Sequence, residues 1–130
     1  MFDQFELMRM SKDLALHAAA RQSVVAANLA NADTPGYKAA DLQDFAETYR
    51  SAEGVADLRR TRPDHLPGFA GEGAARRITD NAVEPSPNGN TVALETELVR
   101  SSSAKRQHDV ALAVYKSSLD LLRSALGRGR

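Results

Sequence analysis

The sequence predicts a mainly α-helical protein, in which a long N-terminal and a long C-terminal helix form an antiparallel, coiled-coil-like pair. Apolar residues near the N-terminus recur at helical spacing, and a heptad pattern runs through residues 94–126. The residues between contain four of the five prolines and most of the glycines, which predicts an irregular segment with little or short β structure. We expect one domain over residues 1–130, divided into 1–40, 41–90 and 91–130.

The first helix is predicted over about residues 5–31. Residues at steps of three and four are apolar in its first half and turn polar in its second half. Alanine is abundant in the second half, which favours helix and lets another helix approach closely. Asn31 is expected to end the helix in a left-handed conformation. The repeat positions are Leu7, Met10, Leu14, His17, Arg21, Val24, Asn28 and Asn31.

A turn is predicted directly after this helix. Proline at the second position and glycine at the third position of residues 34–37 fit a type II turn. Asn28 and Asn31 lie one helical turn apart and have two interpretations: they cap a frayed helix end, or their amides fix helix register across an interface. The residues of this signature turn are Asp33, Thr34, Pro35, Gly36 and Tyr37.

The C-terminal helix carries the most regular pattern in the chain. Its seam positions alternate spacings of four and three, which is typical of a coiled coil and spans roughly 50 Å of helix. The ends of this seam are apolar, its centre is polar, and Gly127 is expected to end the helix. The seam consists of Leu94, Leu98, Ser101, Lys105, His108, Leu112, Tyr115, Leu119, Leu122 and Leu126.

A second apolar set, Val110, Val114 and Leu121, lies about 160° to 200° from Leu112 around the same helix. If one seam serves a partner within the chain, the other set needs cover from another element of this chain or from a neighbouring copy. We expect subunit contacts through both terminal helices. The candidate residues are Leu7, Met10, Leu14, Val24, Asn28, Leu29, Asn31, Leu98, Val110, Leu112, Val114, Tyr115, Leu119, Leu121, Leu122 and Leu126.

The middle segment shows no strong periodicity. Residues 42–49 are predicted as a short helix or an irregular arm, and residues 76–83 and 91–94 as possible short strands. Residues 68–73 are predicted to be flexible, and residues 88–90 (Asn-Gly-Asn) to form a turn.

No combination of residues in this sequence predicts catalysis. The chain has no cysteine, which excludes disulfides and thiolate metal sites. His17 and His108 fall on the two helix seams and are expected to be packing residues, whereas His65 lacks neighbouring ligands for a metal. Glu95 and Glu97 are two residues apart and do not share a helix face. We therefore predict no catalytic, metal or cofactor-binding residue.

Charge and hydropathy exclude further classes. Lys plus Arg equals Asp plus Glu, 17 each, and no run is basic enough to predict nucleic-acid binding. No apolar run is long enough to predict a membrane span. The N-terminus lacks a basic stretch followed by an apolar one, so we expect no cleavable secretion signal. Nothing indicates a small-molecule substrate.

The run NLANADTPGYK at residues 28–38 resembles the N-terminal signature of the flagellar axial proteins, the family of rod, hook and hook-associated proteins. Within that family, residues 32–39 with Asp41 after them are most similar to proximal rod proteins. RTRPDHL at residues 60–66 resembles the central segment of the family, and NGNTV at residues 88–92 resembles its lead into the C-terminal helix. SSSAKR at residues 101–106 is smaller and more polar than the family pattern.

The resemblance implies a structural, non-enzymatic subunit of the proximal rod of the bacterial flagellar basal body. Such subunits assemble helically through their terminal helices and transmit torque across the periplasm. The implied partners are copies of the same chain, rod proteins of the FlgC, FlgF and FlgG types, a FliE-type adaptor, the MS ring and the flagellar type III export apparatus. The alternative is a soluble helical adaptor or export chaperone of a secretion system.

Overall fold

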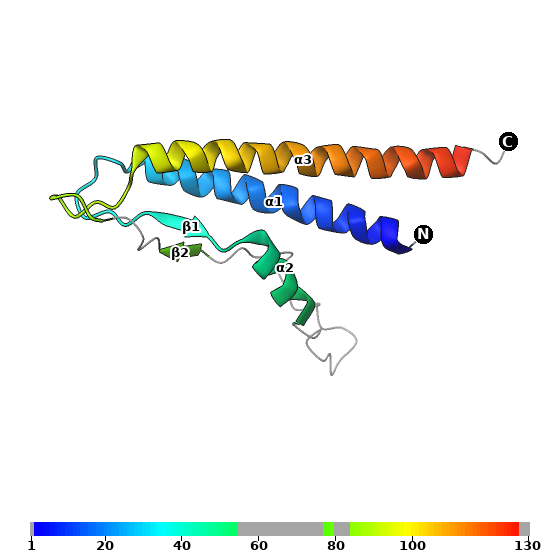
Figure 1. Cartoon of the computed structure of the whole chain (residues 1–130), viewed down its shortest axis with the longest axis horizontal. Coiled ribbons are helices and arrows are strands. Elements are labelled where there is room, and N and C mark those ends of the chain that lie inside the picture. Colours follow the sequence, from blue (N-terminus) through cyan, green and yellow to red (C-terminus); the bar gives the residue numbers. More distant parts are fainter. Residues whose placement is uncertain (1, 55–76, 80–83, 128–130) are drawn as a thin grey trace, which may run out of the picture.

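The fold consists of two long helices and a short arm that leaves them near the middle of their length (Figure 1). The computed structural model describes residues 2–54, 77–79 and 84–127. The prediction of a mainly helical chain with short β structure in its middle is confirmed. The elements in order are α1 (Phe2–Ala30), β1 (Ala40–Leu42), α2 (Phe45–Gly54), β2 (Arg77–Thr79) and α3 (Leu94–Gly127).

The helices α1 and α3 run antiparallel along one another, as predicted. Two hydrogen bonds fix their register: the side-chain amide of Gln22 donates to Ser101 Oγ at 2.8 Å, and that of Asn28 donates to Glu97 Oε2 at 3.1 Å. Asn28, the later residue in α1, therefore bonds to Glu97, the earlier residue in α3, as antiparallel helices require. Figure 1 shows the two helices separating toward the chain termini.

Small residues, rather than the predicted leucines, form the contact between the helices. In α3, three buried small residues recur every seven positions, namely Ala104, Ala111 and Ser118, in line with Glu97. In α1, Ser11, Ala18 and Val25 are buried at the same spacing. Short side chains let two helix backbones approach closely, so this seam excludes water without large apolar groups.

The two buried serines of the seam carry no unsatisfied hydroxyl. Ser11 Oγ donates to the carbonyl oxygen of Met8, and Ser118 Oγ donates to that of Val114, both at 2.9 Å. Hydroxyls that bond to their own helix need nothing from the opposite helix. Serine can therefore take the place of alanine in this contact.

The leucine seam is not the buried centre of the contact, because five of its ten positions are exposed and the other five are only half-buried. The exposed fractions are 61% for Leu98, 41% for Leu112 and 79% for Leu126. Each residue turns an α-helix by about 100°, so leucines one position after the buried residues stand on the flank of the pair. On α1, Leu7 and Met10 are exposed as well, whereas Leu14 is half-buried.

The arm (residues 40–54) consists of β1 and α2. In the two-stranded antiparallel sheet, Ala40 of β1 pairs with Thr79 of β2. The buried His17 of α1 holds the arm: His17 Nε2 lies 2.9 Å from the carbonyl oxygen of Gln43, and its ring meets that of Phe45 edge-on at 5.6 Å. His17 is therefore a packing residue, as predicted.

Predictions for the middle segment were partly right. A short helix forms, but it begins at Phe45, and one predicted strand forms only over Arg77–Thr79. Residues 91–94 are not a strand, because Thr91 bonds to the loop after α1 and α3 begins at Leu94. The strand β1 was not predicted. Residues 60–66, which include His65, and residues 68–73 lie outside the described residues.

Candidate functional site

The signature turn is a type II turn. The backbone nitrogen of Tyr37 donates to the carbonyl oxygen of Thr34 at 3.3 Å, and Gly36 has a φ of 72°. Only glycine adopts this φ without strain, which explains the Pro-Gly pair. The prediction for Asn31 is wrong, because in the part of the chain that the structure describes only Gly36 and Gly89 have positive φ. The side chain of Asn31 instead donates to the carbonyl oxygen of Ala27 at 2.8 Å.

The turn that follows α1 is bound by Asn90, a residue just before α3. The side-chain nitrogen of the buried Asn90 lies 3.0 Å, 2.8 Å and 2.9 Å from the carbonyl oxygens of Asn31, Ala32 and Thr34. These three carbonyls lie in the turn after Ala30, the last residue of α1, and those of Asn31 and Thr34 also accept backbone hydrogen bonds within the turn. Asn90 therefore ties this turn to the residues that lead into α3. Its side-chain oxygen accepts a hydrogen bond from the backbone nitrogen of Val92 at 2.7 Å.

Two loops are hydrogen-bonded to each other around the Asn90 side chain, and we name them the loop clasp (residues 31–39 and 86–92). The backbone nitrogen of Gly36 donates to the carbonyl oxygen of Asn88 at 3.0 Å, and that of Thr91 donates to the carbonyl oxygen of Tyr37 at 3.1 Å. A Cβ on Gly89 would lie 3.5 Å from the Cα of Gly36, so the two turns touch through their glycines. The two sequence motifs, far apart in the chain, thus build one structural unit.

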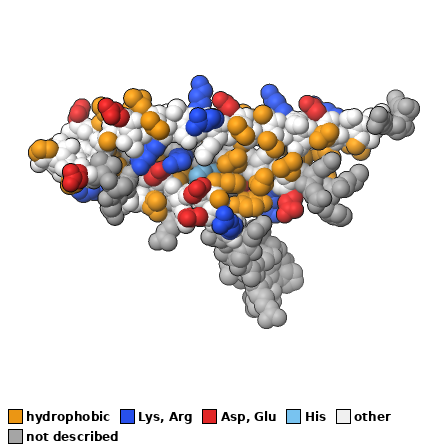
Figure 2. Space-filling model, in the orientation of Figure 1, with side chains coloured by type: hydrophobic (Ala, Val, Ile, Leu, Met, Phe, Trp, Pro, Cys, Tyr) orange, Lys and Arg blue, Asp and Glu red, His pale blue; other side chains and the backbone are white. Residues whose placement is uncertain are grey.

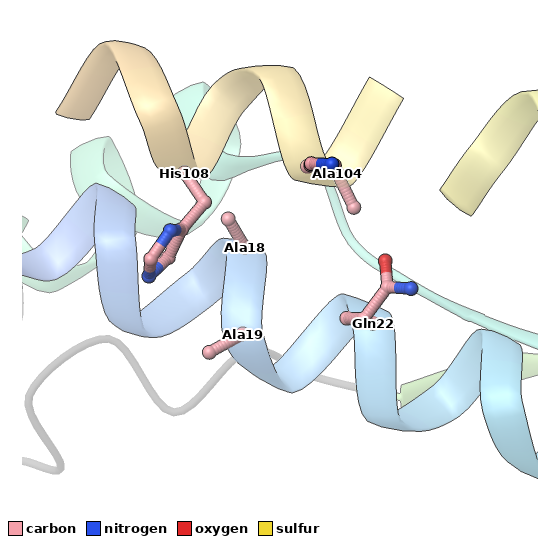
Figure 3. Close-up of a pocket in the computed structure, with 6 residues that line it drawn as sticks. Ala18, Ala19, Gln22, Ala104 and His108 are labelled. Atoms are coloured by element: carbon pink, nitrogen blue, oxygen red, sulfur yellow. The ribbon is translucent and has the colours of Figure 1, made fainter. Parts of the chain in front are cut away.

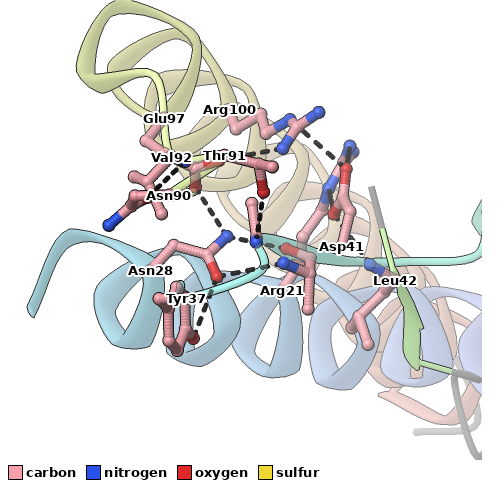
Figure 4. A network of polar contacts seen from close by, with 12 residues as sticks. Arg21, Asn28, Tyr37, Asp41, Leu42, Asn90, Thr91, Val92, Glu97 and Arg100 are labelled. Atoms are coloured by element: carbon pink, nitrogen blue, oxygen red, sulfur yellow. Dashed lines mark hydrogen bonds and ion pairs between the residues drawn. The ribbon is translucent and has the colours of Figure 1, made fainter. Parts of the chain in front are cut away.

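A charged network lies beside the clasp and joins α1, the arm and α3 (Figure 4). Arg21 donates to both carboxylate oxygens of Asp41, at 2.9 Å and 2.7 Å. Arg100 Nε lies 3.5 Å from Asp41 Oδ2, and Arg100 Nη1 lies 2.8 Å from the buried Glu97. Two guanidinium groups face two carboxylates, so the charges balance where burial would penalise an unpaired one.

Asn28 extends this network to the clasp. Its side-chain nitrogen donates to the carbonyl oxygen of Ala40 at 2.7 Å, and its oxygen accepts from the backbone nitrogen of Ala40 at 3.1 Å and from the Tyr37 hydroxyl at 3.3 Å. Asn28 is fully buried, so it is not part of a frayed helix end. It fixes register within the chain, between α1, β1 and Glu97.

The arginines decide the protonation of Asp41. Burial by itself raises the pKa of the Asp41 carboxyl, but the hydrogen bonds from Arg21 and the Leu42 backbone, with the charges of Arg21 and Arg100, outweigh it and hold this pKa below its ordinary value. The hydrogen bond to Asp41 raises the pKa of Arg21, against the opposing effect of desolvation. Asp41 and Arg21 are therefore both ionised at neutral pH.

A hollow of about 420 Å³ opens between α1 and α3 where the leucine seam becomes polar (Figure 3). Figure 3 shows the His108 side chain extending from α3 toward α1 at one side of this hollow. His108 is half-buried, in agreement with its predicted position on a seam. The lining residues are Ala18, Ala19, Gln22, Ala104, Lys105 and His108.

Two apolar surfaces of α3 are exposed or half-buried, on either side of the small-residue seam. We name them the leucine flank (Leu98, Leu112, Leu119 and Leu126) and the valine flank (Val110, Val114 and Leu121). The exposed fractions of Val110 and Leu121 are 53% and 55%. In Figure 2, hydrophobic side chains gather over the half of the molecule nearest the termini.

The candidate contact residues fall into three groups by burial. Those still available at the surface are predominantly apolar and lie on both helices. Val24 and Asn28 are buried, so the chain itself covers them. Leu14, Asn31, Val114, Tyr115, Leu119 and Leu122 are half-buried, as is Tyr37 of the signature turn. Leu7, Met10, Leu29, Leu98, Val110, Leu112, Leu121 and Leu126 are exposed, as are Asp33, Thr34, Pro35 and Gly36 of the turn.

The described residues place no set of groups together in the manner of a metal site: no three His, Asp or Glu side chains among them could hold an ion. Within the same residues, neither long helix is apolar enough to cross a membrane. The structure is a helix pair that the loop clasp holds together at one end and that has two apolar flanks on α3.

Comparison with known proteins assigns this architecture to a class. A family model described as flagella basal body rod protein matches residues 16–38, which cover the second half of α1 and the signature turn. The class that this match indicates is that of the structural, non-enzymatic rod proteins of the flagellar basal body.

Full-length relatives narrow the class. The chain is 31% identical to the flagellar basal body rod protein FlgB of Agrobacterium fabrum, over 86% of each chain. It is 34% identical to FlgB of Escherichia coli, over 85% of this chain and 86% of that one, and 33% identical to FlgB of Cereibacter sphaeroides over 82% of each. The chain belongs to the FlgB family, which confirms the resemblance seen in its sequence.

Proposed function

We propose that this chain is a subunit of the proximal rod that assembles helically with copies of itself through its two terminal helices. The observation that carries the proposal is the exposure of the leucine flank, with Leu98 61% and Leu126 79% exposed. Exposed apolar surface on a small chain marks a contact. Each leucine that a neighbour buries would contribute roughly 1.5–3 kcal/mol to assembly.

The geometry suits a load-bearing subunit. The small-residue seam and the charged network hold α1 and α3 as one unit, so a load applied to one helix passes to the other. A head-to-tail contact that does not close generates a helical array, which a shaft requires. Such a shaft would transmit torque across the periplasm.

The finer partners are part of the same proposal. We infer that the chain contacts rod proteins of the FlgC, FlgF and FlgG types and, at the inner end of the rod, a FliE-type adaptor and the MS ring. Transit through the flagellar type III export apparatus would deliver it to the rod. An adaptor or export chaperone is not favoured, because the relatives of this chain are rod proteins.

A charge on the leucine flank tests the proposal. Leu112→Asp is introduced into a strain that lacks the wild-type chain, and we measure swimming and the amount of subunit in purified basal bodies. Because Leu112 is 41% exposed, the monomer should still fold, whereas the rod should lack the variant and swimming should be lost. Ala113→Asp, at the adjacent exposed position, is the matched control and should swim normally. Normal swimming with Leu112→Asp would refute the proposal.

A further inference from the structure

The turn at residues 88–90 contains an Asn-Gly pair, which is chemically reactive. Asn88 is exposed and is followed directly by Gly89. An asparagine side chain is attacked by the backbone nitrogen of the next residue, and glycine permits this attack best because it has no side chain to obstruct the ring closure. We propose that Asn88 is a deamidation site, and that the closed loop clasp suppresses the reaction.

The reaction needs only water as co-reactant. The backbone nitrogen of Gly89 loses its proton to solvent and bonds to Cγ of Asn88. The bond from Cγ to the side-chain nitrogen breaks, and that nitrogen leaves as ammonia with a proton taken from water. Water then opens the five-membered succinimide at either carbonyl, which yields aspartate or isoaspartate at position 88. No atom is oxidised or reduced.

The clasp holds both reacting groups away from this path. The backbone N–H of Gly89 donates to the carbonyl oxygen of Ser86 at 2.7 Å, which orients it away from the Asn88 side chain. Asn88 Oδ1 accepts a hydrogen bond from the backbone nitrogen of Asn90 at 3.0 Å, which fixes the amide. Ring closure must break both bonds, so it proceeds from a locally opened clasp.

The two products affect the clasp differently. Aspartate keeps the main chain and the Oδ1 acceptor, so the clasp can close again. In isoaspartate the main chain runs through Cβ and Cγ, and the former carbonyl of residue 88 becomes a free carboxylate. That carbonyl accepts the hydrogen bond from Gly36 at 3.0 Å, and the longer main chain displaces Asn90 from the turn after α1. Isoaspartate at position 88 therefore keeps the clasp open.

Peptide mapping of the full chain tests the suppression. The chain is incubated in mildly alkaline buffer, folded or unfolded in urea, and mass spectrometry with isoaspartyl methyltransferase labelling follows position 88. Asn31, which precedes alanine, is the internal reference. Asn88 should convert faster than Asn31 in urea, and at least about tenfold more slowly in the folded chain than in urea. Equal rates in the folded and unfolded chain would overturn the proposal.

Two further comparisons test the link to the clasp. Asn90→Ala loosens the clasp and should raise the rate at Asn88 in buffer toward the rate in urea; should this variant fail to fold, the wild-type comparison still decides. Isolated isoaspartate-88 chain should melt at a lower temperature than Asn88→Asp, which has the same composition and charge but the normal main chain. Equal melting temperatures would contradict the predicted effect on the clasp.

Discussion

The side-chain nitrogen of Asn90 lies 3.0 Å from the carbonyl oxygen of Asn31, although 59 residues separate the two in the chain. The turn that follows the first helix is thus bound by residues that lead into the last helix. Each loop also donates a backbone hydrogen bond to the other, from Gly36 to the carbonyl oxygen of Asn88 and from Thr91 to that of Tyr37. The clasp therefore ties the start of the C-terminal helix to the end of the N-terminal one.

Replacing Asn90 should destabilise the whole helix pair. Asn90→Ala removes the side-chain donor from the carbonyl of Ala32 and the acceptor from the backbone nitrogen of Val92, while the carbonyls of Asn31 and Thr34 keep their backbone donors. We expect the free energy of unfolding to fall by about 2–3 kcal/mol. Urea unfolding followed by circular dichroism measures the change. Glu84→Ala, an exposed substitution outside the clasp, is the control and should change this free energy by less than about 0.5 kcal/mol. A loss for Asn90→Ala as small as that of the control would contradict the role of Asn90 in holding the clasp.

Gly36 should not tolerate a side chain, although the fold leaves space for one. Its φ of 72° lies in the left-handed region, and among the described residues no atom outside its chain neighbours would lie within 4 Å of an added Cβ. Gly36→Ala should therefore lower the free energy of unfolding by about 1 kcal/mol through backbone strain alone. Gly127→Ala, with no positive φ and open space, is the control and should not destabilise. If Gly36→Ala leaves urea unfolding unchanged, the turn is not held in this conformation in solution.

Asp41 should make stability depend on pH in acid. Its pKa in the folded chain is lowered, so as the pH falls the unfolded chain binds this proton first. The stabilisation from Asp41 is complete well above about pH 4, the ordinary value of an Asp carboxyl, and is lost as the pH falls through the lowered pKa. Asp41→Asn should cost about 1–3 kcal/mol at neutral pH and nothing once Asp41 is protonated.

Urea unfolding of both chains across this pH range measures the dependence. The two stability curves should converge in acid and separate toward neutrality. Asp33→Asn, an exposed residue of the signature turn, controls for the loss of one negative charge and should follow the wild type. Parallel curves for Asp41→Asn and the wild type would show that Asp41 is not stabilised by the arginines.

The helices were predictable because their periodicity is local, but their packing was not. The leucine repeat and the small-residue repeat share the seven-residue spacing, and hydrophobicity favours the leucines. Ala104, Ala111 and Ser118 form the internal seam because their short side chains let the helices approach closely. Hydropathy measures apolar character and not side-chain size, so it does not predict this contact. Their spacing, matched by Ser11, Ala18 and Val25, was the available signal.

The site was predictable only in part, because its contacts join distant residues. The Pro-Gly turn follows from the local sequence, and so does the turn at residues 88–90. That Asn90 binds the turn after α1 is a tertiary contact, and no pattern near position 90 in the sequence predicts it. Arg21 and Asp41 likewise carry no motif, and β1 is too short to show alternation.

The internal seam should reject larger side chains. Ala104 is 1% exposed where α3 meets α1, and Ala104→Leu forces extra methyl groups into this contact. We expect the free energy of unfolding to fall by about 1–3 kcal/mol. Ala113→Leu on an exposed face of α3 makes the same chemical change and should be nearly neutral. Equal effects in urea unfolding would mean that the helices do not pack through Ala104.

The valine flank should be a second assembly contact, independent of the leucine flank. Val110 is 53% exposed, so Val110→Asp should leave the stability of the monomer within about 0.5 kcal/mol of the wild type. In a helical array each subunit has neighbours on more than one side, and a buried unpaired carboxylate on either side opposes assembly. We therefore expect Val110→Asp to reduce the amount of subunit in purified basal bodies, with Val110→Leu, which keeps an apolar side chain, incorporated normally. Incorporation of Val110→Asp at the wild-type level, together with exclusion of Leu112→Asp, would restrict assembly to the leucine flank.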